Sequence, residues 1–137
     1  MAQPVEFLTE RECFEFIRNQ TGMNPFNGVG IQNRKDGKTL LRSVDDTFYY
    51  ADDLQNPLQI QYTLFGRHGN QDVNENRFNF CLVHEDREIF VYRRHQRNRQ
   101  KLWTWYGQYK KVGMSQKIHP DINGQMRIIH ILHLVPV

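Results

Sequence analysis

The stretch EIFVYRRHQRNRQKLWTWYGQYKKV, residues 88–112, decides the fold class of this chain. Residues 88–92 and 102–106 are rich in β-branched and aromatic side chains, which predicts two strands. The polar residues 93–101 between them predict a basic loop or hairpin tip, and residues 109–112 continue the sheet. A β-rich architecture is therefore expected around this segment.

Two tryptophans in this stretch, Trp103 and Trp105, lie two positions apart. Side chains at positions i and i+2 of a strand point to the same face of a sheet. We therefore interpret this shared face as part of the core rather than as a surface that stacks on bases.

The N-terminal part of the chain has the pattern of a helix. Residues 9–12, Thr-Glu-Arg-Glu, match a capping box, and Cys13 and Ile17 fall on one helical face. This predicts a helix near residues 9–19 that stops before Gly22. A second, short helix is expected near residues 74–82.

Beyond Ile31 the pattern changes to strands and turns. Further strands are expected at residues 39–41, 58–65 and 126–135, and turns at residues 35–38, 119–121 and 121–125. The fold class is therefore α+β and mainly β: a twisted sheet or small barrel of about six strands with an N-terminal helix. Residues 1–137 are expected to form one domain.

Composition fits a globular protein, with 39% hydrophobic and 24% charged residues. No segment approaches the roughly 20 apolar residues that span a bilayer, and the start lacks a secretory signal pattern. No membrane partner is therefore expected. Cys13 and Cys81 are interpreted as buried or partly buried thiols in a reducing compartment, the nucleus or the cytoplasm.

Positive charge is concentrated in one segment. Residues 87–111 contain eight basic residues and one acidic residue, whereas the net charge of the whole chain is only +3. Such asymmetry indicates an anionic partner, most commonly nucleic acid. The alternative interpretation is a solvated, charged hairpin without a partner.

The sequence lacks common catalytic motifs: no nucleophile elbow, P-loop or HExxH helix is present. His84, Glu85 and Asp86 are interpreted as a charged turn. His130 and His133 are three apart on a predicted strand, so they face opposite sides and do not share a metal. A binding protein is expected, not an enzyme, with no cofactor and no metal.

Several motifs in a fixed order resemble the SRA (YDG) domain family. They are residues 28–31 (Gly-Val-Gly-Ile), 37–41 (Gly-Lys-Thr-Leu-Leu), 50–53 (Tyr-Ala-Asp-Asp), 61–63 (Gln-Tyr-Thr), 70–71 (Asn-Gln), 76–77 (Asn-Arg) and 106–112 (Tyr-Gly-Gln-Tyr-Lys-Lys-Val). The resemblance implies an SRA/PUA-like fold. It also implies binding to duplex DNA that carries a modified cytosine, with the base flipped into a pocket.

The resemblance also implies which residues form the base pocket. Tyr50 corresponds to the aromatic residue that stacks on the base, Tyr62 to a second aromatic, and Thr63 to a neighbouring hydroxyl. Asp53 corresponds to the carboxylate that accepts hydrogen bonds from the amino edge of cytosine, and Gly30 lies in the first motif. A flipped base needs π faces in place of its lost stacking and an acceptor for its amine.

This chain has bulky residues, Phe48 and Tyr49, where the family has small ones before the first tyrosine. The sequence is compatible with two structures: a pocket that accepts a base, or a pocket that these aromatic side chains fill. The ordinary alternative is that Tyr50 and Tyr62 are sheet aromatics and that Asp52 and Asp53 cap a turn.

Basic residues are expected to contact the nucleic-acid backbone, because lysine and arginine neutralise phosphates. The candidates are Arg67, Arg77, Arg93, Arg94, Arg97, Arg99 and Lys101, and the amides of Asn74 and Asn76 are expected to add phosphate contacts. The expected partner is duplex DNA. The alternatives are an RNA- or protein-binding PUA-like module without base flipping, or an accessory subunit of a nuclease.

Overall fold

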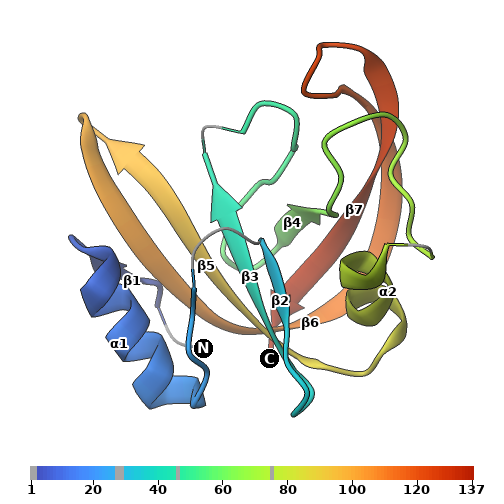
Figure 1. The fold of residues 1–137 in the computed structure, drawn as a ribbon. Helices are drawn as coiled ribbons and strands as arrows, with labels where there is room; N and C mark the ends of the chain where they lie inside the picture. The colour runs from blue at the N-terminus through green and yellow to red at the C-terminus, as the bar shows by residue number, and fades with distance from the viewer. Residues whose placement is uncertain (1–2, 27–29, 46, 75) are drawn as a thin grey trace.

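The computed structural model describes residues 3–26, 30–45, 47–74 and 76–137. Gly28, Val29 and Asp46 lie outside the described residues. The described chain is mainly β, with seven strands and two helices, and its strongly twisted sheet does not close into a barrel (Figure 1). The predicted α+β class is thus confirmed, as a sheet and not as a closed barrel.

The sheet has the strand order β2-β3-β5-β6-β7-β4, and β1 adds to β6. Neighbouring strands are antiparallel except β3 and β5, which run parallel. The strands are β1 (Val5–Phe7), β2 (Ile31–Asn33), β3 (Lys38–Val44), β4 (Ile60–Thr63), β5 (Glu88–Arg97), β6 (Gln100–Pro120) and β7 (Met126–Pro136).

β6 is one continuous strand of 21 residues, not the two short strands and the turn at 119–121 that the sequence predicted. The chain is not interrupted at Gly107, which has a φ of 96° beside a register shift in β5. A second shift lies between Lys111 and Gly113. Such bulges bend a strand without ending it, which explains why the sequence signals of a break were misleading.

Of the two structures predicted for residues 93–101, the hairpin tip is confirmed and the loop is wrong. β5 continues to Arg97 and β6 begins at Gln100, so the connection is a two-residue turn. Asn98 and Arg99 have φ values of 52° and 66°, the left-handed pair that a tight hairpin requires. Most of the basic residues in this segment therefore lie on strands.

Both predicted helices are confirmed, with slightly different ends. α1 spans Glu10–Thr21; the Thr9 hydroxyl accepts the N–H of Glu12 at 3.2 Å, and Gly22 closes the helix in the left-handed region. α2 spans Arg77–His84 and is capped by Asn76, whose side chain accepts N–H groups of the first turn. None of the described helices is long and apolar enough to cross a membrane.

β4 is shorter than the predicted strand at residues 58–65. The Asn56 side chain accepts the N–H of Leu58 at 3.0 Å, and the Gln59 N–H bonds to the Asn56 carbonyl, so this end forms a turn. Beyond Thr63, the Leu64 N–H still donates to the His130 carbonyl of β7 at 3.0 Å. The loop after β4 therefore stays attached to the sheet.

The sheet packs two hydrophobic clusters. α1 covers one of them, which contains Cys13, Ile17, Tyr92 and Trp105 with Trp103 against its side, so the predicted core face is confirmed. α2 covers the other through Leu82. Both cysteines are free thiols; Cys13 is buried, which raises its pKa to about 12, and Cys81 is partly buried.

A buried asparagine connects α2 to the loop after β4. The Asn79 side chain is fully buried, accepts the Phe65 N–H at 2.8 Å, and donates to the carbonyls of Phe65 and Asp72 at 2.9 and 3.0 Å. All three backbone groups would lose their partner if the amide were removed.

Asn79→Ala should lower the free energy of unfolding by about 2–4 kcal/mol, because it leaves buried polar groups unsatisfied. Urea denaturation measures the change. Asn19→Ala, the same substitution on an exposed position of α1, is the control and should change stability by less than about 0.5 kcal/mol. Equal effects at the two sites would contradict this assignment.

Candidate nucleic-acid interface

A pocket of about 270 Å³ lies between the start of β2, the upper end of β3 and the loops that flank β4. Gly30, Tyr50, Tyr62 and Thr63 line it, as the sequence predicted they would converge. Asp52, Arg67 and Arg94 complete its polar wall. Gly30 and Tyr62, which are 32 positions apart in the chain, thus meet at one pocket.

Tyr62 forms the floor of this pocket. Its side chain is 4% exposed, and its hydroxyl lies 3.0 Å from the Gly30 carbonyl and 3.2 Å from the Arg42 carbonyl. Burial raises its pKa well above the ordinary value. A Cβ at Gly30 would meet the Tyr62 hydroxyl at 3.0 Å, so the close approach of this hydroxyl to the backbone favours a glycine here.

Asp52 is the acid of the pocket, and it is held by two hydrogen bonds. One carboxylate oxygen accepts the Thr63 N–H at 2.7 Å, and the other accepts the Ser43 hydroxyl at 2.8 Å. The Thr63 hydroxyl in turn accepts the Ala51 N–H at 2.8 Å. Burial raises the pKa of Asp52, and the two hydrogen bonds oppose that rise. A carboxylate can accept further bonds, so the site retains acceptor capacity.

The prediction that Asp53 lines this pocket is wrong. Asp53 is exposed and lies outside the lining; its backbone pairs with Gln61, and its side chain accepts the Gln55 N–H at 3.1 Å. In extended backbone, successive side chains point to opposite sides. Because Tyr50 lines the pocket, alternation places the side chain of Asp52, two positions on, at the same pocket. This signal in the sequence could have indicated Asp52 rather than Asp53 as the lining acid.

Tyr50 stands at the pocket wall beside two further aromatic residues. Its hydroxyl accepts the Gly66 N–H at 3.3 Å, and burial raises its pKa. The rings of Tyr49 and Tyr50 lie 4.8 Å apart, centroid to centroid. Phe48 is 59% exposed and is not part of the lining, whereas Tyr49 is. The pocket remains open although the residues before Tyr50 are bulky.

Arg127 of β7 fastens the loops that form the pocket, a role that the sequence did not indicate. This residue is 3% exposed, and its guanidinium donates to the carbonyls of Tyr49 at 2.6 Å and Gly66 at 2.5 Å. Desolvation lowers its pKa, and the charge remains because arginine is protonated at any ordinary pH. It holds together the loop before β4, which contains Tyr50, and the loop after β4.

The basic residues that were predicted to contact phosphate differ in their surroundings: some line the pocket, some form ion pairs and some are exposed. Arg67 and Arg94 line the pocket. Arg93 pairs with Asp45 at 2.7 Å, and Arg97 pairs with both carboxylate oxygens of Glu6 at 3.0 Å. Arg99 and Lys101 are exposed at the β5–β6 turn, and Arg77 is exposed at the start of α2.

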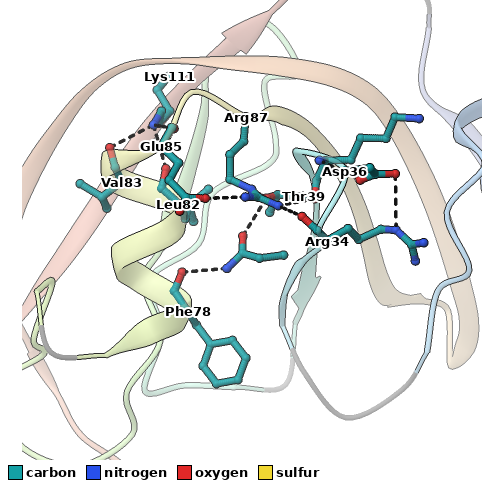
Figure 2. Close-up of polar contacts among 11 residues, drawn as sticks. Arg34, Asp36, Thr39, Phe78, Leu82, Val83, Glu85, Arg87 and Lys111 are labelled. Atoms are coloured by element: carbon teal, nitrogen blue, oxygen red, sulfur yellow. Dashed lines mark hydrogen bonds and ion pairs between the residues drawn. The ribbon is translucent and has the colours of Figure 1, made fainter.

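Two basic residues that contributed to the charge count support the fold instead (Figure 2). The Arg87 guanidinium donates to the Thr39 hydroxyl at 2.7 Å and to Glu85 at 2.5 Å. The Lys111 ammonium donates to the carbonyls of Leu82 and Val83 in the last turn of α2 and to the Glu85 carbonyl just after it, at 2.8 to 3.0 Å. The charge asymmetry of the sequence therefore overstated the exposed positive surface.

The two asparagines expected to contact phosphate have other partners. Asn76 caps α2, and Asn74 bonds to His84 at 2.9 Å. Within the described ranges, no group of three His, Cys, Asp or Glu residues is placed to hold a metal ion.

No protein-family model and no curated protein matches the sequence. Solved structures do match. The SUVH5 SRA domain bound to fully hydroxymethylated CG DNA superposes with a TM-score of 0.62 at 17% identity, over 98% of this chain and 87% of that one. This chain has the SRA fold. The fold implied by the sequence motifs is thereby confirmed.

Larger proteins contain the same fold. KRYPTONITE in complex with mCHH DNA, an H3(1-15) peptide and SAH matches with a TM-score of 0.66 at 16% identity. The sulfur-binding and SRA domains of ScoMcrA, complexed with phosphorothioated DNA, match at 0.63 and 15%. This chain is covered completely in both matches and spans 32% and 40% of those chains.

The raised pKa of Asp52 predicts a pH-dependent difference between wild type and Asp52→Asn. The folded state binds this proton more tightly than the unfolded state does. The free energy of unfolding of wild type, relative to the variant, should therefore fall as the pH rises from the ordinary value of 3.8. Urea denaturation of both proteins between about pH 4 and about pH 7 measures it. A difference that stays constant or rises with pH would contradict the assignment.

Proposed function

We propose that this chain binds duplex DNA and takes a modified cytosine, flipped out of the helix, into the pocket between Tyr50 and Asp52. The observation that carries the proposal is the pocket itself, which aromatic side chains, one carboxylate and three arginines line on an SRA fold. The proposal gives the chain a reading role and no catalytic step. A DNA partner accords with a location in the nucleus or the cytoplasm.

The pocket supplies what an extruded base needs. Flipping costs a few kcal/mol of stacking and pairing, and stacking on an aromatic ring returns about 1–3 kcal/mol. Tyr50 is the side chain suited to this stacking, whereas Tyr62 is too deeply buried to offer a free face. Asp52 is suited to accept a hydrogen bond from the exocyclic amine, the expected pairing of an acid with cytosine.

The surroundings of the pocket suit a duplex. The β5–β6 hairpin and the β6–β7 hairpin rise on opposite sides of the loop between β3 and β4 (Figure 1). Arg67 and Arg94 lie at the pocket, and Arg99 and Lys101 lie at the β5–β6 turn, so positive charge extends from the pocket to one hairpin. Phosphates on either side of a flipped nucleotide would find guanidinium groups there.

Asp52→Asn should remove most of the preference for a modified cytosine, by about tenfold or more, since the acceptor is exchanged partly for a donor. Affinity for an unmodified duplex should stay nearly constant. Fluorescence anisotropy with duplexes that differ by one 5-methyl group, at fixed salt, measures both quantities; a structured RNA serves as a further competitor.

Asp53→Asn is the matched control, because this acid is adjacent in sequence but outside the pocket. It should retain the wild-type preference. If the two variants behave alike, or if wild type prefers RNA or has no preference between the two duplexes, the proposed function is wrong.

The exposed pair Arg99 and Lys101 should contribute only non-specific affinity. Arg99→Gln/Lys101→Gln should weaken binding to modified and unmodified duplexes alike, and should reduce the slope of log K against log salt by about two. Arg18→Gln/Lys35→Gln removes the same charge from exposed positions at the end of α1 and in the β2–β3 turn. An equal change of slope in both double variants would exclude the β5–β6 turn as a phosphate contact.

A further inference from the structure

The second half of β6 has an open edge. β5 pairs with β6 only as far as Tyr109, and β1 pairs with residues 103–105, whereas β7 pairs with the opposite edge up to Pro120. Among the described residues, no strand pairs with the remaining edge of β6 between Lys111 and Pro120. This part of β6 forms the outer margin of the sheet (Figure 1). Its unpaired N–H and C=O groups are a template for another strand.

This open edge is also apolar. Residues 112–118 are exposed throughout, and three of them are large hydrophobic residues: Val112 is 58% exposed, Met114 44% and Ile118 67%. On β7, Ile128 pairs with Ile118 and is 39% exposed, and Met126 is 64% exposed. Adjacent exposed apolar residues on an unpaired strand indicate an interaction surface rather than an ordinary surface strand.

Met114 and Ile118 lie on the face of β6 opposite His119. His119, on the other face of β6, bonds to the Phe48 carbonyl at 2.7 Å, and Arg127, its partner on β7, bonds to the Tyr49 carbonyl. Alternation then directs Met114 and Ile118 to the opposite side.

The residue pattern along the edge is symmetric about Gln116. Met114 and Ile118 lie two positions to either side of it, and Val112 and Pro120 lie four positions to either side. If two copies paired antiparallel with Gln116 opposite itself, Met114 of one would face Ile118 of the other. Such cross-strand apolar pairs are the units that stabilise a sheet.

Charge is compatible with the same register. Residues 110–120 contain three lysines and no acid, so a pairing that set lysine against lysine would be unfavourable. With Gln116 at the centre, Lys117 lies opposite Ser115 of the second copy, and no two lysines are directly opposed. We infer that the occupant of this edge is a second copy of this chain, which forms a two-fold dimer with a sheet continuous across both protomers.

Sedimentation velocity of the DNA-free protein, from about 1 µM to about 200 µM, tests the dimer over the range of weak association. The expected result is a concentration-dependent shift from monomer to dimer. Met114→Lys/Ile118→Lys should abolish that shift. Leu8→Lys/Leu58→Lys, which changes residues that are 61% and 52% exposed elsewhere on the molecule, should preserve it. Circular dichroism checks that each variant is folded.

A cysteine at the two-fold axis tests the register. In a Cys81→Ser background, Gln116→Cys should form a disulfide dimer under mild oxidation, since directly opposed Cα atoms lie about 4.5–5.5 Å apart. Cys13 is fully buried and should not react. Lys110→Cys, six positions from the axis, should not cross-link.

A protein that stays monomeric throughout, a dimer that survives Met114→Lys/Ile118→Lys, or equal cross-linking at positions 110 and 116 would overturn the inference. None of these measurements uses DNA. Failure here is therefore distinguishable from failure of the proposed function.

Discussion

The backbone hydrogen bonds of β6 are the feature on which the rest of the structure depends. Its first half pairs with β5 and β1, and its second half pairs with β7, so one strand of 21 residues joins both parts of the sheet. The irregularities beside Gly107 and Gly113 let this strand bend instead of ending. The bend raises the two hairpins on opposite sides of the loop between β3 and β4, as Figure 1 shows.

Buried and partly buried polar side chains then fix the loops that the sheet leaves free. Arg127 holds the carbonyls of Tyr49 and Gly66, Asn79 satisfies the backbone of Phe65, and Asp52 accepts the Thr63 N–H. Each group is costly to bury unless its partners are in place. The loops around the pocket are therefore held in a defined arrangement before any ligand binds, which reduces the entropy that binding must overcome.

Local patterns predicted the helices well, because their signals are short-range. The cap at Thr9 and the stop at Gly22 depend only on neighbouring residues. The length of β6 could not be predicted in the same way. A glycine within a strand signals a bulge or an end equally, and only the pairing partners, β5 and β7, decide between them. The short β1 exists for the same reason, since three residues gain their order from β6.

The order of the sequence motifs predicted which residues converge at the candidate pocket. The errors of this prediction also have physical causes. Gly30, Tyr50, Tyr62 and Thr63 converge because β2, β3 and β4 bring them together. Asp52 and Asp53 are adjacent and identical in type, so only backbone alternation separates them. The count of charged residues could not show that Arg87 and Lys111 donate to acceptors within the protein. The sequence does not distinguish a partly buried cation from an exposed one.

A crystal structure of the chain with a duplex that carries one 5-methylcytosine would show whether a base enters the pocket. The proposed function requires that the modified base leaves the helical stack, lies against the Tyr50 ring and directs its amino group to the Asp52 carboxylate. A complex in which every base remains stacked in the duplex, with the pocket empty, would contradict it.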